Sequence, residues 1–445
     1  MHTMPPLSTE PLKFSLPTIH HDQLDNGTPI HCIFDPTEDL VTVTVALSTG
    51  SIYDTTPGET SVTAQMLNRG TTRLDAAQFA EEVERRGCNL RSVGDTDACS
   101  LQASGLSEWF DDLVDLTAEA LTQPRFDPTE LDTLRRRMIA DMMVDLVDVE
   151  WLAARACAIR AYDGHPYARP RHGTPSTLRT LTREHLVAVH NRMLHAPRHI
   201  IVAGPIAPDV ARAKLNSVLG GLPNHTDYHR IDRATMRKRS GVIALRPDAV
   251  QTAFRIALPS TTFAADDYAA VQLCTGVLGG YTLARLFTIL REEKGYTYGA
   301  YAFGDVRPHG STVGVVTSVG NEFTLDTMQV IANEIDRIGT QRIDDEEFSN
   351  AQQHLLGSFA RSNETPQQTA GLVWSMIHHQ VPMSFYNSYV ERLQQLTPDD
   401  VREAQRTYFT RDAWVVGLAG REDVIRPALD GMVETIETWT PEGYA

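Results

Sequence analysis

Histidine is the side chain that most often binds a catalytic metal ion, and four histidines lie close together in this sequence. His185, His190, His195 and His199 are separated by five, five and four residues. Side chains three or four positions apart share one face of a helix, whereas side chains five apart do not. The patterns H-x-x-E-H, H-x-x-H and H-E-x-x-H, which place two histidines around one zinc ion, occur nowhere in the chain. The histidines therefore do not predict a metal site.

Arg291 and Tyr298 form a second combination with chemical potential, because they lie seven residues apart. A guanidinium and a phenol can both donate hydrogen bonds to a substrate carbonyl, and the phenol can also stabilise the oxyanion of a tetrahedral intermediate. An arginine at a helix end and a tyrosine on a strand also have purely structural roles, in the helix dipole and in packing. The residue types alone leave both interpretations open.

The elements around this pair follow from the local pattern. Residues 283–294 predict a helix with an apolar side, and Gly295 would close it in the left-handed conformation, with Arg291 in the last turn. The residues that follow predict a strand, whose alternation would place Tyr296 and Tyr298 on one face. The predicted apolar side of the helix consists of Leu283, Leu286, Phe287 and Leu290.

Two further segments contain residue types that are suited to binding. Gly279, Gly280 and Tyr281 precede the helix, where a glycine-rich loop would let a peptide backbone approach closely; an ordinary helix entry explains them equally well. Asp95 and Asp97 could bind a cation only with more ligands than their segment offers. We expect a substrate-binding loop in the first segment and no metal ion at the second.

The bulk composition limits the partners of the protein. Its 445 residues have a net charge of -17, whereas nucleic-acid binding needs a basic surface. Five scattered cysteines without a C-x-x-C pair fit a reducing compartment. The N-terminal segment lacks the basic start and apolar core of a signal peptide, and no apolar run approaches the ~20 residues that span a bilayer. We expect a cytoplasmic protein that binds neither nucleic acid nor membrane.

The sequence repeats one structural unit. Residues 42–51, 126–142, 181–195 and 197–206 recur in the same order as 251–260, 343–360, 396–410 and 411–420, at offsets from 209 (42 to 251) to 217 (126 to 343). Each unit combines alternating strands with amphipathic helices, which predicts an α+β domain with a mostly antiparallel sheet and helices packed on one face. We expect domains over 1–223 and 241–445, joined by the polar linker 224–240.

Three local signatures in these units resemble the insulinase/pitrilysin family of zinc peptidases, whose members are built from such duplicated domains. They are GHPYARPRHGT (164–174), IIVAGPI (200–206) and LARLFTILREEKGYTYGAYA (283–302). Active members carry H-x-x-E-H on a helix of the first domain, where the glutamate acts as general base on the zinc-bound water. An arginine and a tyrosine from the second domain assist them, and these match Arg291 and Tyr298.

The stretch that corresponds to the zinc motif is ETSVTAQMLNRGT (59–71). The two histidine positions fall on Ser61 and Gln65, the general-base position falls on Ala64, and the third ligand falls around Ala140 or Asp141. Hydroxyls and amides are poor zinc ligands, and a methyl group cannot move a proton. The resemblance therefore implies a chain without zinc or any other cofactor, and without independent peptidase activity.

Similar enzymes include heterodimers in which one subunit supplies the zinc motif and the other supplies the arginine and tyrosine. The resemblance implies that Arg291 and Tyr298 hold the scissile carbonyl of a peptide beside the zinc of a homologous partner subunit. The peptide would add as a strand to a sheet edge, and small peptides, including leader sequences, are the implied substrates. Two alternatives remain: a scaffold subunit, like the zinc-free core subunits of a respiratory complex, and a stand-alone peptide-binding homodimer.

Overall fold

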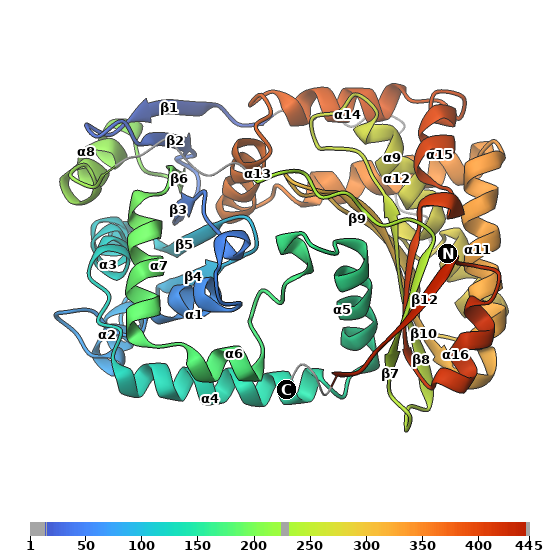
Figure 1. Ribbon diagram of the computed structural model, residues 1–445. Coiled ribbons are helices and arrows are strands. Elements are labelled where there is room, and N and C mark those ends of the chain that lie inside the picture. Colours follow the sequence, from blue (N-terminus) through green and yellow to red (C-terminus); the bar gives the residue numbers. More distant parts are fainter. Residues whose placement is uncertain (1–13, 15, 224–230, 442–445) are drawn as a thin grey trace, which may run out of the picture.

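A computed structural model describes residues 14, 16–223 and 231–441. Two six-stranded sheets lie side by side, one built from each half of the chain (Figure 1). The predicted linker, 224–240, begins outside the described residues. Its described part is irregular chain that leads into the second sheet at Ser240.

The first sheet has the strand order β1-β2-β6-β3-β5-β4. Neighbouring strands are antiparallel, except β2 and β6, which run parallel. The strands are β1 (Ile19–Gln23), β2 (Pro29–Phe34), β3 (Leu40–Leu47), β4 (Asn89–Gly94), β5 (Cys99–Leu106) and β6 (Arg198–Gly204). Valine and threonine fill the central strand β3, which is buried along nearly its whole length, as is typical of a strand covered on both faces.

Within the described residues, eight α-helices accompany this sheet. They are α1 (Glu59–Met66), α2 (Ala76–Glu84), α3 (Phe110–Thr122), α4 (Pro128–Asp145), α5 (Val149–Ala161), α6 (Pro175–Thr180), α7 (Arg183–His195) and α8 (Pro208–Leu219). All of them except α5 contribute side chains to the first hydrophobic core, together with one face of the sheet.

The second sheet has the strand order β12-β7-β11-β8-β10-β9. The strand β7 runs parallel to both of its neighbours, β12 and β11, and the other neighbours are antiparallel. The strands are β7 (Ser240–Leu245), β8 (Gln251–Pro259), β9 (Ala300–Asp305), β10 (Thr312–Gly320), β11 (Val415–Gly420) and β12 (Thr435–Trp439). The helices are α9 (Tyr268–Thr275), α10 (Arg285–Phe287), α11 (Thr324–Thr340), α12 (Asp345–Arg361), α13 (Pro366–His378), α14 (Phe385–Gln395), α15 (Arg402–Tyr408) and α16 (Glu422–Leu429).

The two sheets confirm the predicted duplication. The order β2-β6-β3-β5-β4 recurs as β7-β11-β8-β10-β9, and only the outermost strands, β1 and β12, differ in chain position. Gly204 and Gly420 end the equivalent strands β6 and β11 with positive φ angles of 138° and 148°. A Cβ atom on Gly204 would lie 2.4 Å from the carbonyl oxygen of Leu40, so both conformation and space require glycine. The predicted α+β class with two duplicated, mostly antiparallel sheets is confirmed.

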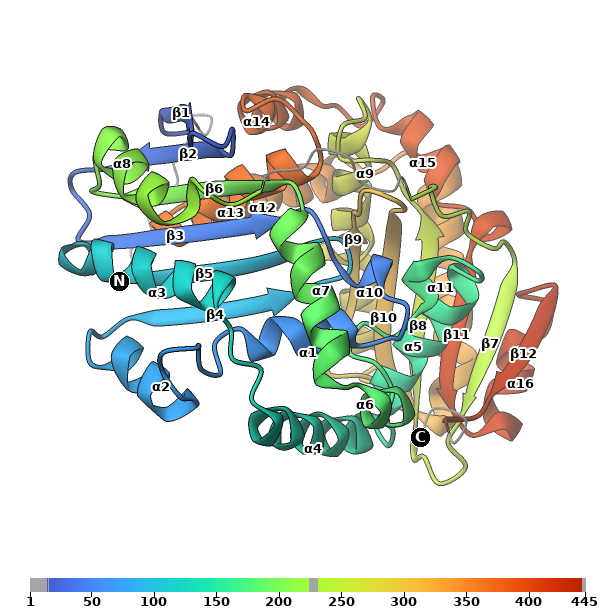
Figure 2. The same cartoon turned by 60° about the vertical axis from the view of Figure 1, so that its left-hand side comes forward.

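The second face of each sheet is covered by a helix from the other half of the chain. Helix α5 leaves the first half and packs on β7, β8 and β11 (Figure 2). A Cβ atom on Gly417 of β11 would lie only 2.6 Å from the Cβ atom of Cys157 in α5. Helix α13 makes the reciprocal contact, because its Val373 and Met376 share a hydrophobic cluster with Ile201 of β6. This exchange of helices joins the two halves, and the duplicated sequence alone does not predict it.

The run from Tyr268 to Glu293 is long and apolar enough, by length and composition, to cross a membrane, but 67% of its most apolar window is buried inside the fold. An extended backbone at Tyr281 separates α9 and its π-helical end from α10 and a π-helical turn, Thr288–Glu293. Leu283 lies in this break and is 71% exposed. Its assignment to the apolar side of one regular helix is therefore wrong, whereas Leu286, Phe287 and Leu290 are buried as predicted.

Candidate functional site

Helix α1 contains the three positions that correspond to the zinc motif. It begins after Gly58, whose φ of +100° is a left-handed conformation that glycine adopts without strain. Ser61 and Ala64 are buried, and Gln65 is partly buried. The methyl group of Ala64 lies over β4, where a Cβ atom added to Gly94 would lie 3.1 Å from it. The position expected for a general base is thus a packing contact between the helix and the edge strand.

Ser61 is engaged by an imidazole. Nδ1 of His172 lies 2.8 Å from Oγ of Ser61, and Nε2 of the same ring accepts a 3.1 Å hydrogen bond from Nε of Arg171. An imidazole that accepts at Nε2 carries its proton on Nδ1, so His172 donates to the serine and cannot take its proton. Burial, together with the charge of Arg171, lowers the pKa of His172 and keeps the ring neutral. The contact is a structural hydrogen bond and does not activate a nucleophile.

Gln65 has a cation as its neighbour. A terminal nitrogen of Arg137 donates a 2.9 Å hydrogen bond to Oε1 of Gln65, and Nε2 of Gln65 lies 3.6 Å from Sδ of Met138. These two residues of α4 lie about one helical turn before Ala140 and Asp141, and Asp141 lines the same cavity as Gln65, so the third-ligand position stays a prediction. A guanidinium at this place repels a metal ion. The described part of the chain contains no group of three or more His, Cys, Asp or Glu residues that could hold a metal ion, and the residues of α1 do not fit zinc.

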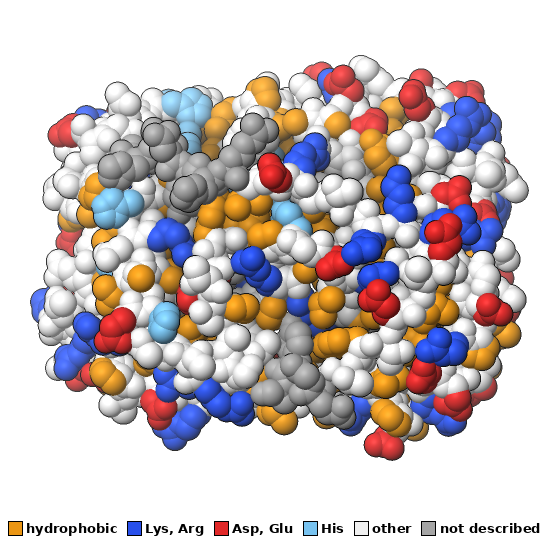
Figure 3. All heavy atoms as spheres, in the orientation of Figure 1, with side chains coloured by type: hydrophobic (Ala, Val, Ile, Leu, Met, Phe, Trp, Pro, Cys, Tyr) orange, Lys and Arg blue, Asp and Glu red, His pale blue; other side chains and the backbone are white. Residues whose placement is uncertain are grey.

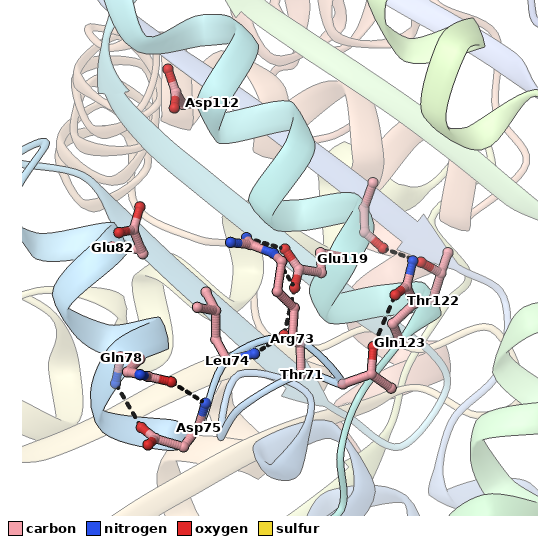
Figure 4. Close-up of polar contacts among 12 residues, drawn as sticks. Thr71, Arg73, Leu74, Asp75, Gln78, Glu82, Asp112, Glu119, Thr122 and Gln123 are labelled. Carbon is pink, nitrogen blue, oxygen red and sulfur yellow. Dashed lines mark hydrogen bonds and ion pairs between the residues drawn. The ribbon is translucent and has the colours of Figure 1, made fainter.

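The loop after α1 is anchored firmly even though the metal ligands are absent (Figure 4). Gly70 adopts a φ of +92°, which turns the chain toward α3. The hydroxyl of Thr71 donates a 2.5 Å hydrogen bond to Glu119 of α3, and Arg73 forms an ion pair of 2.6 Å with the same carboxylate. The N–H of Leu74 closes the loop on the Thr71 hydroxyl at 3.1 Å. The scaffold that positions α1 is thus present.

A cavity of about 640 Å³ lies between the two halves of the molecule. Its wall includes Gln65, helices α4 and α5, the loop 167–173 and strands of the second sheet. Two ion pairs form between residues of the lining, Arg171 with Asp95 at 2.7 Å and Arg307 with Asp305 at 2.8 Å. The arginines in the lining outnumber the aspartates: they are Arg137, Arg155, Arg169, Arg171, Arg255 and Arg307, beside Asp95, Asp141, Asp145 and Asp305. No local pattern in the sequence predicts this arginine cluster, because its members come from separate elements with no common spacing.

Tyr167 connects Asp97 to the second half of the chain beside this cavity. The hydroxyl of Tyr167 donates a 2.8 Å hydrogen bond to Asp97, and the backbone N–H of His309, from the second half, donates to the same hydroxyl at 3.1 Å. Burial raises the pKa of Asp97 to about 6, against the opposing effect of the Tyr167 hydroxyl. Asp95 pairs with Arg171. Each of the two aspartates is therefore engaged by a protein group.

Two further histidines, His190 and His379, also have structural partners. Nε2 of His190 lies 2.6 Å from the carbonyl oxygen of Leu121, and the ring of His379 stacks on Phe263 with centroids 4.5 Å apart. A hydrogen bond therefore accounts for His190, and ring packing accounts for His379.

Arg291 and Tyr298 meet at the surface of the second half. The guanidinium carbon of Arg291 lies 4.9 Å from the ring centroid of Tyr298 and 4.8 Å from that of Phe287, within the range of cation–π attraction. Tyr298 is 87% exposed, so its hydroxyl is open to a ligand that arrives from outside. Neither Arg291 nor Tyr298 lines the cavity between the halves. The structure therefore brings this pair together, but apart from the degenerate zinc motif.

The predicted strand over Tyr296 and Tyr298 is wrong, because β9 begins two residues after Tyr298. The N–H of Tyr296 donates a 2.9 Å hydrogen bond to the carbonyl of Leu290, which closes the helical run around the left-handed Gly295. The ring of Tyr296 then stacks on Phe323 with centroids 4.0 Å apart. Helix capping thus separates the two tyrosines, since Tyr296 packs against the core while Tyr298 is exposed.

Gly279, Gly280 and Tyr281 lie at the π-helical end of α9. A Cβ atom on Gly279 would lie 2.5 Å from the backbone nitrogen of Ala302 in β9, so the close approach that this glycine permits is that of the chain's own strand. Gly280 is exposed, and the ring of Tyr281 stacks on His354 with centroids 4.8 Å apart. A peptide-binding role for this segment stays a prediction.

Comparisons with known proteins match most of the chain to peptidase family M16. A family model described as insulinase (peptidase family M16) matches residues 30–174, and one described as peptidase M16 inactive domain matches residues 180–355. A Helicobacter pylori protein called non-peptidase homolog YmxG is 23% identical over 361 residues, which cover 80% of this chain and 82% of that protein. An uncharacterized zinc protease of Mycobacterium tuberculosis is 22% identical over 427 residues, which cover 92% of this chain and 95% of that protein.

Solved structures show the same fold. A peptidase M16 inactive domain from Pseudomonas fluorescens superposes with a TM-score of 0.85 and 23% identity, covering 90% of this chain and 98% of that chain. A protease from Helicobacter pylori gives a TM-score of 0.81 with 16% identity, covering 91% and 100%. A chain of Complex III2 from Candida albicans gives a TM-score of 0.77 with 13% identity, covering 93% and 100%.

Proposed function

Because the chain belongs to the insulinase (M16) peptidase family but presents a hydroxyl, a methyl and an amide at the positions of the zinc motif, we propose that it is the zinc-free subunit of a two-chain peptidase. A homologous partner would supply the zinc ion and the general base. This chain would supply contacts to the peptide. The match to an inactive-domain model and the likeness to a non-peptidase homologue support a chain without peptidase activity of its own.

The observation that carries this proposal is the exposed contact between Arg291 and Tyr298. Packing on the Phe287 ring fixes the guanidinium of Arg291, and the stacked tyrosine extends from it into solvent. Two hydrogen-bond donors are thus held side by side on the outside of a chain whose own α1 offers no catalytic group. Such a pair suits a carbonyl oxygen that gains negative charge in the transition state, provided that a second subunit brings the zinc.

In the proposed reaction this chain binds and orients the peptide. Arg291 and the Tyr298 hydroxyl would donate hydrogen bonds to the oxygen of the scissile carbonyl and would stabilise its charge as water attacks. Removing one such donor typically costs about 2.7–4 kcal/mol in the barrier. We include small peptides and leader sequences as substrates, and the cytoplasm as the compartment, in the same proposal.

Reconstitution tests the proposal. The purified chain is mixed with an M16 homologue that has an intact H-x-x-E-H motif, and hydrolysis of a fluorogenic, unstructured peptide is followed. We expect activity only in the mixture, reduced roughly 100-fold or more by Tyr298→Phe. Tyr301→Phe is the matched control, since Tyr301 is a partly exposed tyrosine whose ring lies near Phe287. Full activity of the homologue alone would refute the proposal.

A scaffold subunit is the second candidate, and it rests on a shared fold. The likeness to a chain of Complex III2 covers 93% of this protein, although at 13% identity it speaks for the fold alone. Affinity purification of the chain from its host separates the candidates, because a scaffold would return a large assembly and a processing subunit would return one M16 homologue. The third alternative, a stand-alone homodimer, predicts self-association together with peptide binding.

A further inference from the structure

The cavity of about 640 Å³ between the two halves has walls of two kinds. The second half of the chain contributes the guanidinium groups of Arg255 and Arg307. Helices α4 and α5 contribute apolar side chains, which are Met138, Met142, Trp151, Ala154, Ala158 and Ala161. On the face drawn in Figure 3, apolar side chains gather in the middle of the molecule, and basic side chains lie among them. The volume falls within the roughly 300–1,000 Å³ of small-molecule pockets, so the cavity suits a small ligand with an apolar part and an anionic part.

Arg255 lies in this wall without a counter-ion. It is on β8, on the same face as Ala257, which shares a hydrophobic cluster with helix α5. Its guanidinium carbon lies 4.4 Å from the ring centroid of Phe303. The carboxylate of Asp305, which acts on Arg255 electrostatically, is engaged by Arg307 through hydrogen bonds of 2.9 and 2.8 Å. Among the described residues, Arg255 therefore has no ion-pair partner.

The surroundings of Arg255 make this isolated charge costly. Burial lowers the pKa of its guanidinium, and the neighbouring charge of Arg307 has the same effect. An arginine side chain nevertheless keeps its proton inside a protein. A cation that is withdrawn from water is unfavourable unless an anion or hydrogen-bond acceptors replace the lost hydration, and a contact with one aromatic ring replaces it only in part. An anion bound in the cavity would complete the surroundings of Arg255.

Tyr162 is a second, independent sign of a ligand. It follows the last residue of α5, lines the cavity and is only 6% exposed. Its hydroxyl has no hydrogen-bond partner in the part of the chain that the structure describes. Thr312 lies close enough to oppose the rise in pKa that burial causes at Tyr162, but it does not complete a hydrogen bond. Native structures satisfy nearly all buried hydroxyls, so a ligand acceptor is expected here.

Arg255 and Tyr162 belong to one end of the cavity. Each lies within electrostatic range of Arg307 and Asp305, and the phenol also acts on the guanidinium. Both groups are hydrogen-bond donors, and a carboxylate accepts from a guanidinium and a hydroxyl at the same time. The apolar side chains of α4 and α5 line the same space.

We propose that this cavity binds a small carboxylate on an apolar body, with the carboxylate held by Arg255 and Tyr162 and the apolar body packed against α4 and α5. The charged hydrogen bonds would give selectivity, and burial of the apolar body would add affinity. Two sources carry this chemistry: the free C-terminus of a short peptide and a free aliphatic acid. With the peptide as source, the inference rests on the proposed function and deepens it, because the chain would hold its substrate or product by one end. Binding itself requires only this chain.

Isothermal titration calorimetry with the isolated full chain tests the proposal. The ligands are the tripeptide Ala-Val-Leu as free acid and as C-terminal amide, and octanoate beside octanol. We expect at least one of the acids to bind, on the order of tenfold or more tightly than its neutral counterpart. Tighter binding of the peptide acid would identify a peptide C-terminus as the source, and tighter binding of octanoate would identify a free acid. If neither acid binds at millimolar concentration, or if the neutral ligands bind equally well, the proposal is overturned.

Two variants locate the site. Tyr162→Phe removes a hydroxyl that has no partner, so it leaves folding intact, and Arg255→Met keeps an apolar contact with Phe303. Each should weaken binding of the acid on the order of tenfold and leave the neutral counterpart unchanged. The controls are Tyr301→Phe and Arg183→Met, which lie outside the cavity lining and should bind like the native chain.

Circular dichroism verifies that each variant is folded. Acid binding by Tyr162→Phe that equals binding by the native chain would overturn the assignment even if Arg255→Met failed to fold. Neither variant touches the exposed pair that the reconstitution assay tests, and the calorimetry uses no zinc-bearing partner. Failure of the carboxylate site would therefore leave the two-chain proposal standing, and failure of reconstitution would leave the carboxylate site standing.

Discussion

Replacing Gly417 with alanine tests the packing of helix α5 on the second sheet, which connects the two halves of the chain. The new methyl group would lie 2.6 Å from Cβ of Cys157 and 2.8 Å from the carbonyl oxygen of Ala153, both in α5. Carbon atoms in contact are ~3.5–4.0 Å apart, so the helix must move by roughly 1 Å or more away from the second sheet. Overpacking of this kind typically costs about 1–3 kcal/mol, and we expect the free energy of unfolding to fall by that amount.

Urea denaturation followed by circular dichroism measures this loss. Gly371→Ala is the matched control, because Gly371 lies inside α13 and a Cβ atom there meets no atom within 4 Å. Alanine is the better helix former by up to about 1 kcal/mol, so the control should be neutral or stabilising. If the Gly417→Ala variant proved as stable as the native chain, the tight docking of α5 on the second sheet would be refuted.

Two further predictions concern buried charges. The raised pKa of Asp97, about 6 against an ordinary 3.8, means that the folded state holds the proton more tightly than the unfolded state. This group stabilises the fold fully below pH ~4, and the contribution is lost as the pH rises through about 6, a loss of at most about 3 kcal/mol. Asp97→Asn, which keeps an acceptor for Tyr167, should therefore be more stable than the native chain at neutral pH but not near pH 4; equal pH profiles in urea unfolding would contradict this. Arg285 is 6% exposed and pairs with Glu347 through two hydrogen bonds of 2.6 and 2.8 Å. Because Arg285→Leu leaves the carboxylate without its partner, the variant should lower the free energy of unfolding by about 3 kcal/mol or more. A loss well under 1 kcal/mol would show that the pair contributes little.

The sequence predicted the duplicated sheets because their signal is local. Alternating apolar residues in β3 and β8, and the recurring pattern of β6 and β11, appear at a nearly constant offset, so the repeated unit can be recognised without tertiary information. The pattern of residues 92–106 is typical of one strand, but the turn around Asp95 divides this segment between β4 and β5. A hairpin of this kind is easily missed when polar turn residues continue the alternation.

The rest of the site depends on packing between distant segments. Nothing local distinguishes α5, which crosses to the other sheet, from the helices that pack on their own sheet, because its role depends on how Leu152, Ala153 and Ala156 fit against the distant second sheet. The arginines of the cavity between the two halves come from α4, α5, β8 and separate loops, and no spacing links them. Tyr298 is exposed because Gly295 ends the helical run in a left-handed turn and β9 begins only after Tyr298. The alternating tyrosines predict a strand at this place and do not indicate the turn.

The central claim concerns helix α1: with Ser61, Ala64 and Gln65 at the positions of the zinc motif, this chain binds no zinc and has no peptidase activity of its own. The most direct measurement is the metal content of the purified single chain after equilibration with zinc and gel filtration, combined with an assay on an unstructured peptide in the presence and absence of a chelator. We expect substoichiometric zinc and no chelator-sensitive hydrolysis. One tightly held zinc ion per chain, together with hydrolysis that the chelator abolishes, would contradict it.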